Sequence, residues 1–349
     1  MIDESAQMPD DFYFMTQSRT SQRTFAILLG AFFCVATINH GHALQKEVSE
    51  DEYRAAKKVE NARDATDALN AAADFVKSYP KTTIKAIVAN KTAAKITEVK
   101  DPAQKAAFAE KFLTIFTTPP ESEIIYSTQI DAYIKSGRDD DAFKAGAAHF
   151  EKHPDDAGGL TILAWEGVDQ LKKKNPAYAA ESVQYANQAV KVMESGSKPA
   201  DFTEEQWKIF KASWLPKLYQ AIGLISMMSG DDEEARAKLE KSLQYDAKDP
   251  GTYMLLGEAA NNQYRALAAK TQGMSAGPER EADLKKALEQ MDHVIQYDAQ
   301  AVALSEGRAE YKPLHDQLME NLTEYYKYRH NGSTEGLQQL LDSYKKSAK

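Results

Sequence analysis

A short internal repeat constrains the fold of this chain more than any other feature of its sequence. Residues 243–247 return as residues 295–299, 52 positions further along, and both copies contain the triplet Gln-Tyr-Asp. This spacing corresponds to one helical-hairpin unit of about 34 residues plus an insertion of about 18. Because each unit of such an array packs mainly on its neighbours, the length of 349 residues does not fix the number of domains.

A second internal echo supports the same interpretation. Residues 67–80 and 141–154 share a pattern of alanine and aromatic positions, and both end in proline, at Pro80 and Pro154. From residue 49 onward the sequence is a succession of amphipathic segments of helical period, separated by proline and glycine. Little of it alternates with the two-residue period of a strand. These patterns predict an all-α fold.

Three of the units carry residues in a common order. Each has large residues early in its first helix, followed in two of the units by a small residue, and two units have a turn glycine. The second helix carries alanines. The residues are Tyr126, Ile130, Tyr133, Gly137, Ala142 and Pro154 in one unit; Tyr219, Ile222, Gly223, Gly230, Ala235, Leu239, Ser242 and Ala247 in another; and Tyr253, Leu256, Gly257, Ala260, Ala287, Met291, Val294 and Ala299 in the third. This order resembles the tetratricopeptide repeat.

The resemblance implies a TPR-like α-solenoid of about six or seven helical hairpins. One degenerate unit spans residues 81–120, with a weak first helix expected at 82–89 and a strong second helix at 102–116. Longer connections are expected at residues 195–202, before an N-cap at Thr203, and at 271–278. A C-terminal helix within residues 333–345 carries one apolar stripe, so we expect it to cap the array. The stripe residues are Leu337, Leu340, Leu341 and Tyr344.

The first 43 residues have the order of a secretory signal peptide. Arg19 and Arg23 precede an apolar run at residues 25–38, and the small residues Gly41 and Ala43 follow. The run is shorter than the roughly 20 residues of a membrane span. We therefore expect cleavage after Ala43, a helical-repeat domain at 44–349, and a periplasmic or secreted protein, with Met15 as a possible true start. The alternative is an uncleaved leader that anchors the chain in the inner membrane.

Charge and cysteine content exclude several kinds of partner and chemistry. The formal net charge is −9, whereas nucleic-acid binding requires a basic face, so no nucleic-acid partner is expected. Cys34 is the only cysteine and lies inside the apolar run, so a cleaved chain would hold neither disulfides nor thiol chemistry.

No residue set predicts catalysis, a cofactor or a metal. The sequence has no phosphate-binding loop, nucleophile elbow or dinucleotide motif. His149 and His153 share one helix face, but Phe150 stands where a zinc protease requires glutamate, which favours a structural role. Acidic runs at 139–141 and 231–234 follow turn glycines, where they suit the start of a helix. We therefore expect a protein that is not an enzyme, although a site at a helix seam is a further possibility.

The resemblance implies that the chain binds another protein or an extended peptide along a concave face lined by the first helices. On the helix that starts near Gly251, the residues left free by the packing positions are spaced so that they share one side. The predicted groove residues are Asp131, Trp165, Gln220, Leu224, Met227, Met254, Glu258, Asn261 and Arg265. Tryptophan, methionine and leucine among a few charged groups suit a binding hot spot. The alternative is that this stripe is ordinary solvated or inter-hairpin surface.

Overall fold

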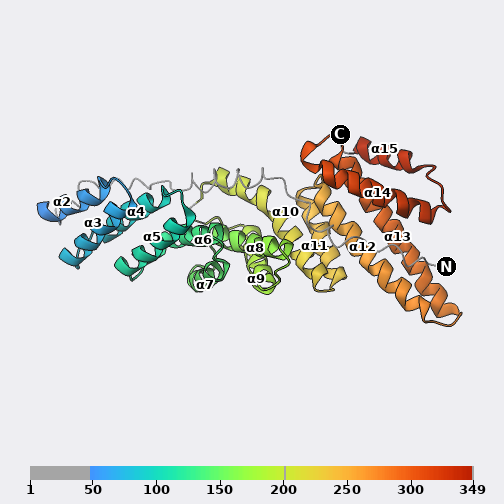
Figure 1. Cartoon of the computed structure of the whole chain (residues 1–349), viewed down its shortest axis with the longest axis horizontal. Coiled ribbons are helices and arrows are strands. Elements are labelled where there is room, and N and C mark those ends of the chain that lie inside the picture. Colours follow the sequence, from blue (N-terminus) through green and yellow to red (C-terminus); the bar gives the residue numbers. More distant parts are fainter. Residues whose placement is uncertain (1–47, 200–201, 348–349) are drawn as a thin grey trace. The chain divides into compact units, whose positions relative to one another are not determined.

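The computed structural model describes residues 48–199 and 202–347 (Figure 1). This part of the chain contains 14 α-helices, two short 3₁₀ helices and no strand, which confirms the all-α prediction. The expected signal peptide, its cleavage site and the possible start at Met15 lie outside the described residues. No helix in residues 48–199 or 202–347 combines the length and apolar character that a membrane span needs.

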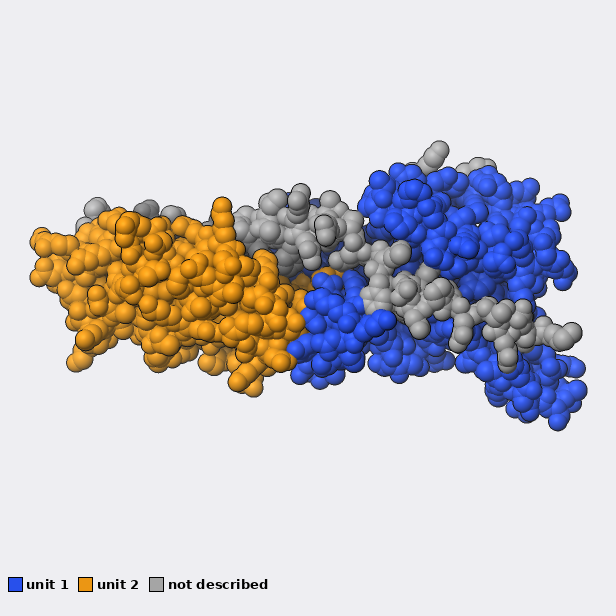
Figure 2. Space-filling view, in the orientation of Figure 1, with its two compact units in different colours: residues 1–32, 167–349 blue, residues 33–166 orange. Residues whose placement is uncertain are grey.

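The chain divides into two compact units, with the boundary between Glu166 and Gly167, inside one helix (Figure 2). The described part of unit 2 is residues 48–166. Its elements are α2 (Glu50–Glu60), α3 (Ala65–Ser78), α4 (Lys85–Thr97), α5 (Pro102–Ile115), η3 (Glu121–Ile125), α6 (Tyr126–Lys135), α7 (Asp139–Phe150) and the first part of α8 (Ala157–Lys172).

Three helices of unit 2 begin at side-chain caps, and the elements from α2 to η3 share one apolar core. The side chains of Ser49, Asp64 and Asp101 accept hydrogen bonds from the backbone amides that open α2, α3 and α5. Such a cap typically contributes about 1 kcal/mol. The core between α2 and η3 is built from Leu69, Val88, Ile96, Phe112, Phe116 and Ile125, among others.

The first helix of the degenerate unit differs from its prediction. It was expected at residues 82–89, but α4 runs from Lys85 to Thr97. The hydroxyl of Thr82 accepts a hydrogen bond from the amide of Ile84, so the chain is still a turn at that point. Beyond Ala89 the buried stripe continues with Ala93 and Ile96, which hold the extra turns in the core.

Glycines with left-handed backbone end the first helices of two units. Gly137 has φ of 72° and Gly230 has φ of 80°. In each turn, the amide of the residue after the glycine bonds to the carbonyl five residues earlier: Arg138 donates to the carbonyl of Tyr133 at 2.8 Å, and Asp231 to that of Ser226 at 3.0 Å. This is the Schellman motif, which closes a helix and needs a residue without strain at positive φ. The predicted turn positions are confirmed in both units.

The described part of unit 1 is residues 167–199 and 202–347. It contains the end of α8, α9 (Ala179–Glu194), α10 (Glu204–Met228), α11 (Asp232–Tyr245), α12 (Pro250–Gln272), α13 (Pro278–Ser305), η4 (Ala309–Tyr311), α14 (Lys312–Arg329) and α15 (Leu337–Ser347). The insertion inferred from the 52-residue spacing does not form a separate element. It lengthens both members of the α12–α13 hairpin, to 23 and 28 residues.

Helix α10 begins well before the repeat itself. Thr203 and Gln206 form a reciprocal capping box, which confirms the predicted N-cap. Pro216 lies inside the helix, and its carbonyl accepts a hydrogen bond from the hydroxyl of Ser242 on α11 at 2.8 Å. At the far end of the unit, Leu337 and Leu341 of α15 are buried in the core of α12–α14. The predicted C-terminal capping helix is therefore confirmed.

Candidate functional site

The first helices α10 and α12 are linked through Gln220, one of the predicted groove residues. Its side-chain amide donates to Asp249 Oδ2 at 2.9 Å and to Thr252 Oγ1 at 3.1 Å, at the start of α12. Asp249 is also the N-cap of α12, because it accepts from the amide of Thr252. The two first helices therefore lie side by side in unit 1, and their stripes form one strip, which we call the α10–α12 strip.

The residues of this strip differ in how far a partner could reach them. Met227 and Met254 are buried in the core, and Asn261 is buried against α14, where its amide donates to the hydroxyl of Tyr325 at 3.2 Å. These three side chains pack between helices. Leu224 is half-buried against two apolar clusters, and Arg265 is exposed. Helix α14 covers part of the stripe on α12, which is why Asn261 is buried while Arg265 is exposed.

Glu258 and Arg265 form the charged end of the strip. Arg265 Nη2 lies 3.3 Å from Glu258 Oε1, while only 10% of the Glu258 side chain is exposed. Burial raises the pKa of Glu258, and the positive charge of Arg265 partly offsets that rise. The pair thus presents an exposed guanidinium above a nearly buried carboxyl group.

Asp131 and Trp165 belong to unit 2, on α6 and α8. Asp131 pairs with Lys135 on its own helix at 2.8 Å, and Trp165 is half-buried. Partner binding by any of the nine residues stays a prediction.

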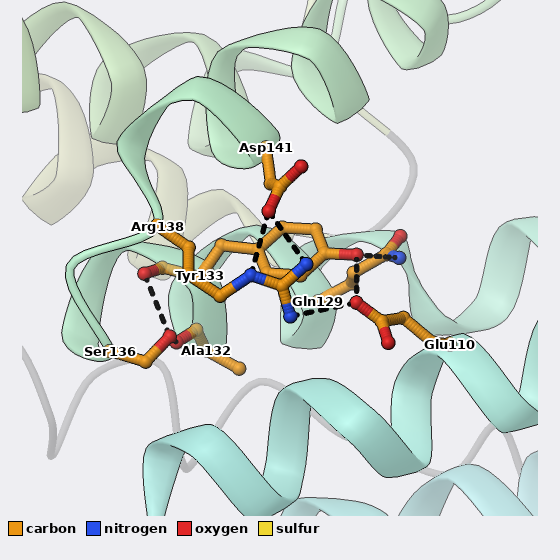
Figure 3. Close-up of polar contacts among 7 residues, drawn as sticks. All are labelled: Glu110, Gln129, Ala132, Tyr133, Ser136, Arg138 and Asp141. Carbon is orange, nitrogen blue, oxygen red and sulfur yellow. Dashed lines mark hydrogen bonds and ion pairs between the residues drawn. The ribbon is translucent and has the colours of Figure 1, made fainter.

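A polar network near Asp131 holds the α6–α7 turn to α5 (Figure 3). Arg138 contacts Glu110 at 2.8 Å and Asp141 at 2.6 Å, and its guanidinium lies 4.4 Å from the centre of the Tyr133 ring. The hydroxyl of Tyr133 donates to Glu110 and accepts from Gln129. Because these groups are about 40% exposed, each ion pair contributes on the order of 1 kcal/mol or less. The network positions a turn, and the carboxylates of Glu110 and Asp141 both have partners in it.

His149 and His153 stack on each other, with ring centres 4.7 Å apart. His149 Nε2 donates to Asp156 Oδ2 at 2.9 Å, and Asp156 also caps α8 by accepting from the amide of Gly159. Burial alone would raise the pKa of Asp156, but these hydrogen bonds lower it. His153 Nε2 lies 3.3 Å from Glu123. No cluster of three or more metal-ligating side chains occurs in the described ranges.

Asp298 was not among the residues predicted for the site, and it is 5% exposed in the last third of α13. It is the second copy of the repeated aspartate. The first copy, Asp246, is exposed after the end of α11. A signal was present, because Val294, Asp298 and Val302 are spaced four apart and lie on one helix face. A carboxylate on an otherwise apolar stripe is costly to bury, which sets this position apart from its neighbours.

The sequence matches no described protein family and no curated protein. Among solved structures, it is similar to a monomeric mutant of IFIT1 with m7Gppp-AAAA, with a TM-score of 0.36 and 13% identity over 80% of this chain and 54% of that one. A second IFIT1 mutant, with Gppp-AAAA, gives 0.37 and the same identity and coverage. The Pseudomonas aeruginosa protein pilF gives 0.33 and 13% identity over 81% of this chain and 99% of that one. The chain thus spans about half the length of the IFIT1 chains, and at these scores no function passes from these proteins to it.

Proposed function

We propose that this chain is a helical-repeat scaffold that binds another protein or an extended peptide along the α10–α12 strip. The observation that supports this is the direct link between consecutive first helices through Gln220. It joins their side chains into one strip that runs from half-buried Leu224 to exposed Arg265. An apolar position beside a charged rim is the arrangement that protein interfaces use.

Capture of a partner by the purified chain tests the proposal. Replacing Arg265 with alanine should weaken capture from an extract of the native host, because the substitution removes an exposed charge at the end of the strip. Proteins retained by the wild type and lost with Arg265→Ala would be identified by mass spectrometry. Trp165→Ala tests the predicted residue of unit 2 separately.

Arg236→Ala provides a matched control. Arg236 lies on the second helix α11, is similarly exposed and pairs with Glu240 at 3.8 Å. The control should capture the same partner as the wild type, and all variants should keep their helical content. Equal loss of capture in Arg236→Ala and Arg265→Ala would contradict a binding face on the first helices.

We further propose that the chain is exported and that its mature form begins at Leu44. The ordered basic flank, apolar run and small residues before that position support this proposal. An intact mass of the protein recovered from its native host checks it. A mass that includes the residues before Leu44 would instead favour the uncleaved, membrane-tethered alternative.

A further inference from the structure

A small cleft lies where α12, α13 and α14 of unit 1 meet. Its volume is about 10 Å³, enough for one water-sized group. Polar side chains from all three helices line it: Glu258 and Asn261 from α12, Asp298 from α13, and Asn321 and Tyr325 from α14. Buried carboxyl, amide and hydroxyl groups gathered around a space of this size form a site for a small polar group rather than a packing defect.

Asp298 is the central group of the cleft. Its side chain is 95% withdrawn from solvent, and within the described residues no donor forms a hydrogen bond with its carboxyl group. Gly257 makes this position possible, because a Cβ there would lie 2.5 Å from Asp298 Oδ1. A buried carboxyl group without a partner is less stable than one that is paired. A ligand that supplies donors would remove that cost.

The carboxyl groups around the cleft carry one negative charge more than the nearby positive groups balance. Glu258 already has Arg265 as a counter-charge at 3.3 Å, which leaves the carboxylate of Asp298 unbalanced. Two carboxyl groups are too few for a divalent ion such as Ca²⁺, which takes six to eight oxygen ligands, many of them charged. Tyr325 also lines the cleft, and an aromatic side chain beside a cation can add to its binding.

We propose that this cleft binds a primary ammonium group. The carboxylates of Asp298 and Glu258 accept hydrogen bonds from its N–H groups, and Tyr325 lies beside it. An ammonium head has the size of a water molecule and offers three donors. Asn321 and Tyr325 are only partly buried, so a carbon chain attached to the nitrogen would leave the cleft beside them.

This inference deepens the proposed function, on which its biological role rests, because it names the chemistry of one contact with the partner. A lysine side chain, an N-terminal amine or a free alkylamine would each supply the same group. Binding should weaken as the pH falls, because burial raises the pKa of Asp298 and the proton then competes with the ammonium.

Calorimetric titration of the full chain with n-butylammonium chloride tests the site. We expect saturable binding in the millimolar range at about pH 8, weaker binding at about pH 5, and no binding of tetramethylammonium, which has no N–H donor. Nα-acetyl-lysine amide and glycine amide then separate side-chain from terminal amines. Asp298→Asn should lower the affinity at least tenfold, in line with the loss of a charge-assisted hydrogen bond.

Glu289→Gln is the matched control, since it removes one exposed carboxylate from the same helix and should leave binding unchanged. If Asp298→Asn does not fold, Glu258→Gln serves the same purpose. Equal binding of sodium and butylammonium, or unchanged binding in Asp298→Asn, would overturn the proposal. Binding of the amine without capture of any partner would support the cleft and contradict the scaffold function. Capture of a partner without binding of the amine would contradict the cleft alone.

Discussion

Replacing Gly167 with alanine is expected to lower the free energy of unfolding by about 2 to 3 kcal/mol. Gly167 lies on α8 where the helix touches α9, and a Cβ there would stand 1.6 Å from Ser182 Oγ and 2.4 Å from Ser182 Cβ. The second atom is fixed to the backbone of α9, so a rotamer change cannot relieve the clash and the helices must separate. Alanine favours a helix interior over glycine by about 1 kcal/mol, which is too little to offset this overpacking.

Denaturant unfolding of Gly167→Ala against the wild type measures this effect. Gly158→Ala is a suitable control on the same helix, because its nearest contact would be Asp156 Oδ1 at 3.4 Å, an ordinary van der Waals distance. Adding Ser182→Gly to Gly167→Ala removes both clashing atoms and should recover much of the lost stability. If Gly167→Ala does not lose stability and the double variant does not regain any, then α8 and α9 do not approach each other closely at Gly167.

The free energy of unfolding should fall as the pH rises, and Asp298 should be a principal cause. Burial, and then the charge of Glu258, hold the pKa of Asp298 well above its ordinary value of 3.8. Below that value the carboxyl group is protonated in both states, and its contribution to stability is complete. Above it the unfolded chain releases the proton while the folded chain keeps it, so stability decreases by up to about 1.4 kcal/mol per pH unit until the folded pKa is passed.

Groups on each neighbouring helix bear on this titration. Glu258 on α12 has a pKa that is also raised by burial, and Arg265 and Asp232 act on it with opposite charges. Tyr325 on α14 has its pKa raised to about 12, so it stays protonated throughout the window. Asp298 is therefore the group in the cleft whose removal should flatten the pH profile most.

Comparing Asp298→Asn with the wild type isolates the effect of this carboxyl group. The free energy of unfolding of Asp298→Asn, measured by urea denaturation between about pH 5 and pH 8, should exceed that of the wild type by an amount that grows with pH. Glu289→Gln should follow the wild-type profile. Parallel profiles for the wild type and Asp298→Asn would show that this carboxyl group titrates normally in the folded state.

Much of the fold could be predicted from the sequence because its signals are local. The glycines at 137 and 230 indicate turns by their backbone freedom, and Thr203 indicates a helix start by its hydroxyl. The start of α10 followed from that cap, although Pro216 lies inside the helix. The length of α4 was missed because its later apolar residues take their place only through contacts with distant helices.

The candidate site was predictable only in part. Helical spacing placed Glu258, Asn261 and Arg265 on one face, as the structure shows them. Which parts of that face stay open depends on α14, whose Tyr325 comes 64 residues after Asn261. A pattern within one helix carries no information about such a partner, so the burial of Met254 and Asn261 could not be read from spacing alone.

In the longer α12–α13 hairpin, the repeated aspartate lies in a different environment from its first copy. Asp246 lies in water after the end of α11, where it accepts a hydrogen bond from the nearby amide of Lys248. Asp298, in the same five-residue segment, lies within α13 and is enclosed by α12 and α14. A repeated Gln-Tyr-Asp triplet can therefore change its chemistry with no substitution in it: longer surrounding helices place an acid that faces solvent in one copy inside the protein in the other.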